Sequence, residues 1–146
     1  MRKRTQAREY TLKILYQAEL TRREINAAAE HFWKEFDSVD NHVKEFASRL
    51  ALGIKDHLEE IDAKISKHAT NWQLKRMAVI DRNVLRIGVF ELLHALDIPP
   101  KVTINEAVEL AKKYGDTESS KFVNGILDKI HKSDSSHTSD DKSNDA

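Results

Sequence analysis

Cysteine is absent from the 146-residue chain, and the chain has only four glycines and two prolines. Without thiols it can form no disulfide and can use no thiolate ligand, which fits a reducing compartment. So few turn-forming residues argue against an all-β fold, whose many turns depend on glycine and proline. No apolar run approaches the ~18–20 residues of a membrane-spanning helix, and no apolar signal-peptide core follows the N-terminus. We expect a soluble, cytoplasmic, all-helical protein.

Motifs that would indicate catalysis are missing as well. The four glycines stand alone, so no glycine-rich phosphate loop can form, and no GxSxG nucleophile turn is present. None of the seven histidines lies in an HExxH arrangement, so we interpret them as surface or interior side chains. We therefore expect no enzyme activity, no cofactor and no metal ligand.

Charge is balanced over the whole chain, with 24 basic and 24 acidic residues, so nucleic-acid binding would need a local patch. Residues 2–23 provide one, because they hold seven basic and two acidic side chains, a local net charge of +5. Arg4 and Arg8 lie one turn apart on a helix that Thr5 is expected to cap, so both should project from the same side. A solvated terminus is the competing interpretation.

Apolar residues recur at spacings of three and four, which predicts a series of amphipathic helices. In the first helix this apolar stripe consists of Ala7, Tyr10, Ile14 and Ala18. A short helix is expected at about 26–36, and its aromatic cluster should lie in the core. Asp40 should cap the next helix, which should break near Gly53 to Asp56. A later helix should open at Asn71.

The segment 99–125 carries a dense set of helix signals. The proline pair at its start disfavours a continuing helix. Thr103 and Glu106 form a capping-box pattern, in which each side chain bonds the other's backbone amide. Gly115 stands where a left-handed C-terminal stop is expected. The candidate caps of the last helix are Asp116 and Thr117.

Phe122 in the last helix has two interpretations from spacing alone. It forms an i, i+4 stripe with Ile126 and Ile130, which is typical of a core face. Val123 and Leu127 form a competing stripe one position round the helix, and both stripes should not point fully inward. Spacing therefore leaves open whether the Phe122 ring is buried or exposed.

Two glycines interrupt predicted helices. Gly88 and Gly125 each cost about 1 kcal/mol relative to alanine inside a helix, which makes sense where another helix packs closely. Both are expected to mark close helix–helix contacts.

Three segments resemble the NusB family of bacterial transcription antitermination factors: Arg8–Tyr16, Asp81–Ile87, and Ile104–Gly115 with Lys121–Lys129. The resemblance covers about residues 4–131. It implies an all-α domain over 1–132, with about seven helices in two packed three-helix bundles. It also implies binding of boxA RNA together with the small-subunit ribosomal protein NusE. The complex would join RNA polymerase with other Nus factors and favour processive transcription of ribosomal RNA operons.

The same resemblance assigns roles to individual side chains. The implied RNA-binding residues are Arg2, Lys3, Arg4, Arg8, Glu118, Ser119, Ser120, Lys121 and Phe122. The basic residues would neutralise phosphates, and Phe122 would stack on an unstacked base. Glu118 would adjust the affinity for RNA, because its negative charge repels the phosphates. The implied contacts with NusE are Tyr16 and Asp81.

Two alternatives keep the helical fold and change the role. The chain would be an RNA-substrate-binding module related to the N-terminal domain of ribosomal RNA methyltransferases, or a self-associating scaffold that forms a homodimer. The serine-rich stretch 133–146 has a net charge of −3 and a single apolar residue, Ala146. It cannot bury enough apolar surface to offset chain entropy, so we expect a disordered tail.

Overall fold

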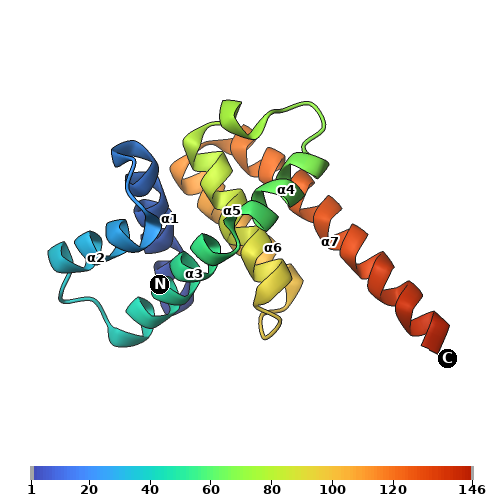
Figure 1. Cartoon of the computed structure of the whole chain (residues 1–146), viewed down its shortest axis with the longest axis horizontal. Coiled ribbons are helices and arrows are strands. Elements are labelled where there is room, and N and C mark those ends of the chain that lie inside the picture. The colour runs from blue at the N-terminus through green and yellow to red at the C-terminus, as the bar shows by residue number, and fades with distance from the viewer. Residues whose placement is uncertain (1, 146) are drawn as a thin grey trace.

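The computed structural model describes the backbone of residues 2–145 and the side chains of residues 2–134. Within them the chain forms seven α-helices and one 3₁₀ helix (Figure 1). These are α1 (Lys3–Thr21), α2 (Ile25–Glu35), α3 (Asn41–Asp56), α4 (Leu58–His68), η1 (Leu74–Arg76), α5 (Val79–His94), α6 (Pro100–Tyr114) and α7 (Thr117–Asp145). Among the described residues, none of these helices has the length and apolarity to cross a membrane.

The central helix, α5, joins two bundles. α1, α2 and α3 pack against one another, while α5 packs with α4, α6 and α7. Further contacts from α1 and α3 to α5 unite the two bundles in one body (Figure 1). The predicted all-α fold with about seven helices in two bundles is confirmed, and the second bundle contains α4 as a fourth helix.

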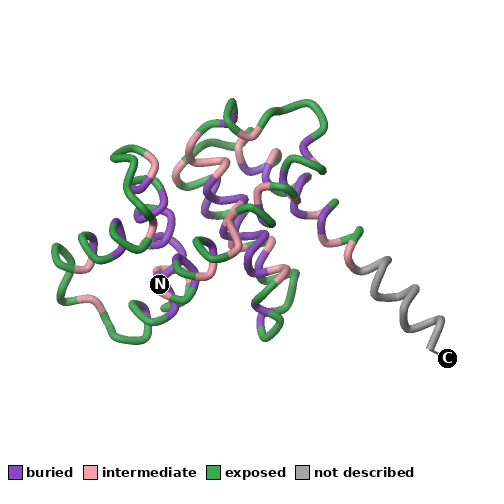
Figure 2. Tube along the Cα trace, viewed as in Figure 1, coloured by how far each residue is buried: buried purple, intermediate pink, exposed green. Residues whose placement is uncertain are grey.

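The core follows the predicted helical periodicity. In α1, Ala7, Ile14 and Ala18 are buried and Tyr10 packs half-buried against them. One large core runs through both bundles, and a smaller one that includes Phe32 fills the space between α1, α2 and α3. Figure 2 shows buried positions on the inward sides of the helices and along much of α5. Of the aromatic cluster predicted for the core, only Phe32 is fully buried, and Phe36 is exposed.

Two of the predicted N-caps are confirmed. The Asp40 carboxylate accepts hydrogen bonds from the amides of His42 and Val43 at the start of α3. Asp116 likewise accepts from the Ser119 amide at 2.7 Å, so Asp116 rather than Thr117 caps α7. Both carboxylates satisfy amides that would otherwise have no partner in the first helical turn.

The other predicted caps are wrong, because the threonines bond distant helices instead. Thr103 donates to Glu91 at 2.9 Å, and Thr5 donates to Glu106 at 2.7 Å. α6 begins four residues earlier than predicted, with Pro100 at its first position, where proline loses no helical hydrogen bond. Gly115 ends α6 as predicted, but its φ of −109° is not left-handed.

Two predicted helix boundaries are shifted. Asn71 lies in a turn region, and α5 starts only at Val79 after the short η1. The break expected near Gly53 to Asp56 falls at His57, where α3 ends and α4 follows directly.

The two helical glycines have different surroundings. A Cβ atom on Gly88 would lie 2.7 Å from Cδ1 of Leu127, so the predicted close contact between α5 and α7 is confirmed. A Cβ on Gly125 would meet nothing within 4 Å, so the same prediction is wrong there. We predicted a disordered tail over 133–146. From residue 135 on this stretch lies outside the residues whose side chains are described, so its disorder stays a prediction.

Candidate nucleic-acid interface

The basic N-terminal end of α1 is exposed and contacts α3 and its N-cap. Arg2, Lys3 and Arg4 are exposed, and Lys3 pairs with Asp40 at 3.3 Å. The guanidinium of Arg4 lies 4.6 Å from the centre of the Phe46 ring and 3.8 Å from Asp97. This end of the molecule therefore presents cations held by contacts with α3.

Arg49 on α3 extends this cationic end and was missed by the sequence reasoning. Its guanidinium lies 5.8 Å from the Phe46 ring centre and binds Asp97 through two hydrogen bonds, the shorter 2.7 Å. The hydrogen bond from Arg49 is the main cause that lowers the pKa of Asp97 below its usual value, against a smaller effect of burial. No local run of charge marks Arg49 in the sequence, because it meets the basic N-terminal end of α1 only through tertiary packing.

Arg8 does not belong to the exposed cations, which corrects the prediction that it projects beside Arg4. Its side chain is 3% exposed, and Nε and Nη2 donate to the two carboxylate oxygens of Glu91 at 2.7 and 2.8 Å. Nη1 lies 3.7 Å from Glu106. Arg8 is therefore a buried link between α1, α5 and α6, and its cation faces no solvent.

Glu9 fastens the turn between α6 and α7 to the middle of α1. Its carboxylate accepts hydrogen bonds from Lys113, at 2.7 Å, and from the Tyr114 hydroxyl. Burial acts most strongly on the pKa of Glu9 and raises it, but the hydrogen bonds and charge of its partners outweigh burial and leave that pKa lowered. Burial first, and then the bond to Glu9, raise the pKa of Tyr114 to about 12. The two hydrogen bonds hold the end of α6 against α1 and so position the start of α7.

The first turn of α7 is only partly as predicted. Glu118 and Lys121 are exposed and pair at 3.6 Å, and Ser119 is half-buried. Ser120 is 7% exposed and its hydroxyl donates to the Thr117 carbonyl, so its predicted availability to RNA is wrong. It lies on the inward side because Val123 and Leu127, three and seven residues on, enter the core.

Phe122 lies at the edge of the core, half-buried, with its ring beside Trp72. The two ring centres are 6.2 Å apart at an interplanar angle of 80°, and Trp72 is 57% exposed. Ile126 and Ile130 of the first stripe and Val123 and Leu127 of the second are all buried, and only the Phe122 ring, at the end of the first stripe, takes the boundary position between core and surface. Trp72 was missed as a surface aromatic, although its place beside Asn71 in a segment of weak periodicity is a usable signal.

The exposed cations Arg2, Lys3 and Arg4 and the Phe122 ring are not side by side, although the family resemblance assigns all of them to RNA binding. Phe122 contacts Trp72 in the connection between α4 and α5, which runs along the top of Figure 1. The N-terminal end of α1 lies low on the left of the same view, and the turn between α6 and α7 lies between the two regions (Figure 1). The structure thus separates the cations from the aromatic pair and joins them through α1 and the α6–α7 turn.

Tyr16, one of the two predicted partner contacts, lines a groove between α1, α2 and the start of α5, and Asp81, the other, directly follows the lining residue Ile80. The groove has a volume of about 470 Å³, and its lining includes Tyr16, Phe32, Phe36, Ile80 and Tyr114. Tyr16 is 38% exposed. Oδ1 of Asp81 is buried without a hydrogen-bond partner among the described residues. An unpaired buried carboxylate oxygen beside an apolar groove is suited to a cationic partner.

The arginines of the segment Asp81–Ile87 serve the fold. Glu19 on α1 accepts from Arg82, with a shortest distance of 2.5 Å, and from Arg86 at 2.7 Å, while Arg86 also binds Asp62 on α4. Burial acts most strongly on the pKa of Glu19 and raises it, but the hydrogen bond and charge of Arg82, helped by Arg86, leave the pKa lowered. This network ties α1, α4 and α5 together.

Comparison with known proteins identifies the family. The NusB family model matches residues 5–132. Transcription antitermination protein NusB of Anaeromyxobacter dehalogenans is 49% identical over 128 residues, which are 88% of this chain and 89% of the relative. NusB of Myxococcus xanthus is 48% identical over 130 residues, covering 87% of this chain and 93% of the relative.

Solved structures agree with these relatives. T. maritima NusB is 45% identical and superposes with a TM-score of 0.82, covering 88% of this chain and 90% of that one. A crystal structure of antitermination factors NusB and NusE in complex with dsRNA contains a chain that is 33% identical, also with a TM-score of 0.82. It covers 91% of this chain and 98% of that one. By fold, sequence identity and family match, the chain belongs to the NusB family.

Proposed function

We propose that this protein is a transcription antitermination factor that binds boxA-type single-stranded RNA together with the ribosomal protein NusE. It acts in the cytoplasm as a non-catalytic adaptor. It joins the RNA polymerase elongation complex with other Nus factors and promotes processive transcription of ribosomal RNA operons. The observation that carries this proposal is the half-buried Phe122 ring beside exposed Trp72, on a chain of the NusB family.

The RNA surface of this proposal, called the RNA face below, has a cationic end and an aromatic end. The cationic end is Arg2, Lys3, Arg4 and Arg49, and the aromatic end is Lys121, Phe122 and Trp72. Cations neutralise phosphates without reading sequence, while exposed rings stack on bases that are already unpaired. A strand that contacts both ends passes the α6–α7 turn, where Glu118 and Ser119 lie.

The aromatic end favours single-stranded over duplex RNA. Bases in an A-form duplex are stacked on one another and offer no free face, whereas an open strand can insert a base beside Phe122 or Trp72. The related structure described with dsRNA makes a duplex the second candidate ligand. A duplex would be recognised through phosphates and 2′-hydroxyl groups and would depend little on the rings.

NusE binding is assigned to the groove that Tyr16 lines and to Asp81, which follows the lining residue Ile80. Tyrosine combines apolar area with a hydroxyl group, and such residues are enriched at the centres of protein interfaces. The unpartnered Oδ1 of Asp81 gives a lysine or arginine of a basic ribosomal protein a specific contact. The groove and the RNA face share no residue, so both ligands can bind at once.

One titration tests the proposal. Fluorescently labelled boxA-like single-stranded RNA is titrated with this protein alone, with NusE alone and with both, and the same series is run with a duplex of the same sequence. The proposal expects the tightest binding for the single strand with both proteins. Equal affinity with and without NusE would contradict the adaptor role, and preference for the duplex would contradict single-strand recognition.

A further inference from the structure

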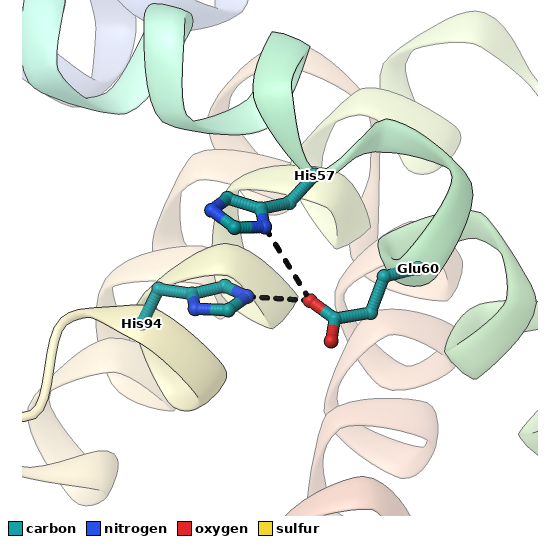
Figure 3. Close-up of side chains that lie close together, drawn as sticks. All are labelled: His57, Glu60 and His94. Atoms are coloured by element: carbon teal, nitrogen blue, oxygen red, sulfur yellow. Dashed lines mark hydrogen bonds and ion pairs between the residues drawn. The ribbon is translucent and has the colours of Figure 1, made fainter.

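Two histidines and one glutamate that belong neither to the RNA face nor to the lining of the Tyr16 groove come together in the structure. His57 lies at the junction of α3 and α4, Glu60 follows in the first turns of α4, and His94 is the last residue of α5 (Figure 3). Their candidate ligand atoms all lie within 4.8 Å of one another. Among the residues with described side chains, no other group of three such residues meets this condition.

Both histidines direct a ring nitrogen toward one oxygen of Glu60. Nε2 of His94 lies 2.5 Å and Nδ1 of His57 lies 3.8 Å from the same oxygen, Oε1 of Glu60. The two imidazole rings are stacked, with centres 3.8 Å apart and planes inclined by 20°. Figure 3 shows both rings turning a nitrogen toward the carboxylate. In this arrangement the His94 nitrogen donates its N–H to the carboxylate, and a tautomer exchange that moves the proton to the other ring nitrogen frees a lone pair for a metal ion.

The spacing suits a tetrahedral metal ion after small movements. Zinc binds imidazole nitrogen and carboxylate oxygen at about 2.0–2.2 Å, so neighbouring ligand atoms lie about 3.4 Å apart. The distance from His94 to Glu60 would open from 2.5 Å, and that from His57 to Glu60 would close from 3.8 Å. Both changes are below about 1 Å, and the nitrogens of the two histidines, which lie within 4.8 Å of each other, would approach to about 3.4 Å as one ring tilts out of the stack. The Glu60 side chain is 52% exposed and has room to rotate.

We propose that His57, Glu60 and His94 bind a divalent transition-metal ion of the zinc class, with water completing the coordination. Imidazole nitrogens suit zinc, nickel or cobalt, whereas magnesium and calcium prefer oxygen ligands throughout. The ion fastens the α3–α4 junction to the end of α5. A ligand that binds only the folded chain stabilises it, so the metal raises the unfolding temperature. Residues at spacings of 3 and 34 form no sequence motif, which is why a motif search misses this site.

The test uses the full chain, freed of metal by chelation. Zn²⁺ is titrated calorimetrically, and thermal unfolding is followed without metal, with Zn²⁺ and with Mg²⁺. At about a hundredfold excess over the measured dissociation constant, Zn²⁺ should raise the unfolding temperature by about 5 °C or more, and Mg²⁺ should not. His57→Ala and His94→Ala should each abolish the Zn²⁺ shift.

Two further variants keep the test decisive. Glu60→Gln preserves the shape of the side chain and should weaken Zn²⁺ binding about tenfold or more, even if an alanine variant folds poorly. His31→Ala is the matched control, because His31 pairs with Glu35 at 3.3 Å but lies in no cluster of three such residues. It should leave Zn²⁺ binding unchanged. Absence of Zn²⁺ binding, equal binding by Glu60→Gln, or an equal effect of Mg²⁺ would overturn the proposal.

Discussion

Arg8 and Glu91 form a buried, bidentate ion pair that joins α1 to α5. Nε and Nη2 of Arg8 donate to the two oxygens of Glu91 at 2.7 and 2.8 Å, and the side chains are 3% and 1% exposed. Thr103 donates to the same carboxylate from α6. One arginine of a basic sequence cluster thus holds three helices together, while its neighbour Arg4 stays at the surface.

Loss of Arg8 should strongly destabilise the protein. Arg8→Ala leaves the Glu91 carboxylate buried without its cation, which should cost about 3–5 kcal/mol of the free energy of unfolding, measured in urea. Arg4→Ala, the control, removes an exposed cation and should cost about 1 kcal/mol or less. The double variant Arg8→Met/Glu91→Leu should recover most of the loss. Equal stability of the Arg8 and Arg4 variants would contradict a buried pair.

Tyr114 should titrate at an unusually high pH. Its pKa is raised from 10.0 to about 12, by burial first and then by the bond to Glu9. The folded state binds this proton more tightly, so the stabilisation is complete below about pH 10 and is lost as the pH rises through about 12. Spectrophotometric titration should show one late tyrosine. Tyr114→Phe should remove that step, and a step that persists would assign it to another tyrosine.

Alanine substitution should affect two helical glycines in opposite directions. A Cβ on Gly53 would lie 2.3 Å from two ring atoms of buried Phe90, so Gly53→Ala should cost about 1–3 kcal/mol by overpacking. Gly125 has open space around it, and Gly125→Ala should add about 0.5–1 kcal/mol through helix propensity. Thermal unfolding measures both. A stabilising Gly53→Ala would show that α3 and α5 do not approach so closely.

Reversal of the charge at position 81 should separate the two binding activities. Asp81→Lys places a cation where a basic partner is proposed to dock, so NusE binding, measured by calorimetry, should weaken by about 2 kcal/mol or more. Binding of RNA by the isolated chain should be unchanged, because Asp81 lies outside the RNA face. Glu118→Lys is the matched control and should leave NusE binding intact. Sedimentation of the chain alone tests the homodimer alternative.

The helices could be predicted from the sequence because their signals are local. Asp40 and Asp116 cap helices by bonding amides two or three residues away, and the apolar stripe of α1 needs only its own periodicity. Thr5 and Thr103 carry the same chemistry as a cap, yet each bonds a glutamate on another helix. Local patterns cannot distinguish these outcomes, because the competing partner is brought near only by the fold.

The candidate site could be predicted only in part, because several of its residues are brought together only by the fold. The family resemblance implied a surface role for Phe122 and a partner contact for Tyr16, and the exposure of both side chains is compatible with those roles. The charge count around Arg4 could not show that Arg8 points into the core, since burial depends on Glu91, 83 residues away. Trp72 and Arg49 join the RNA face only through tertiary contacts.

The aromatic end of the RNA face is the central claim, and RNA affinity of ring-deletion variants tests it most directly. Phe122→Ala and Trp72→Ala should each weaken binding of boxA-like single-stranded RNA by about 1–3 kcal/mol, with duplex binding unchanged. Leu96→Ala, which truncates an 84% exposed side chain outside the RNA face, is the control and should have no effect. Unchanged affinity in both ring variants, or Phe122→Ala that unfolds the chain without a separate loss of RNA affinity, would contradict the account.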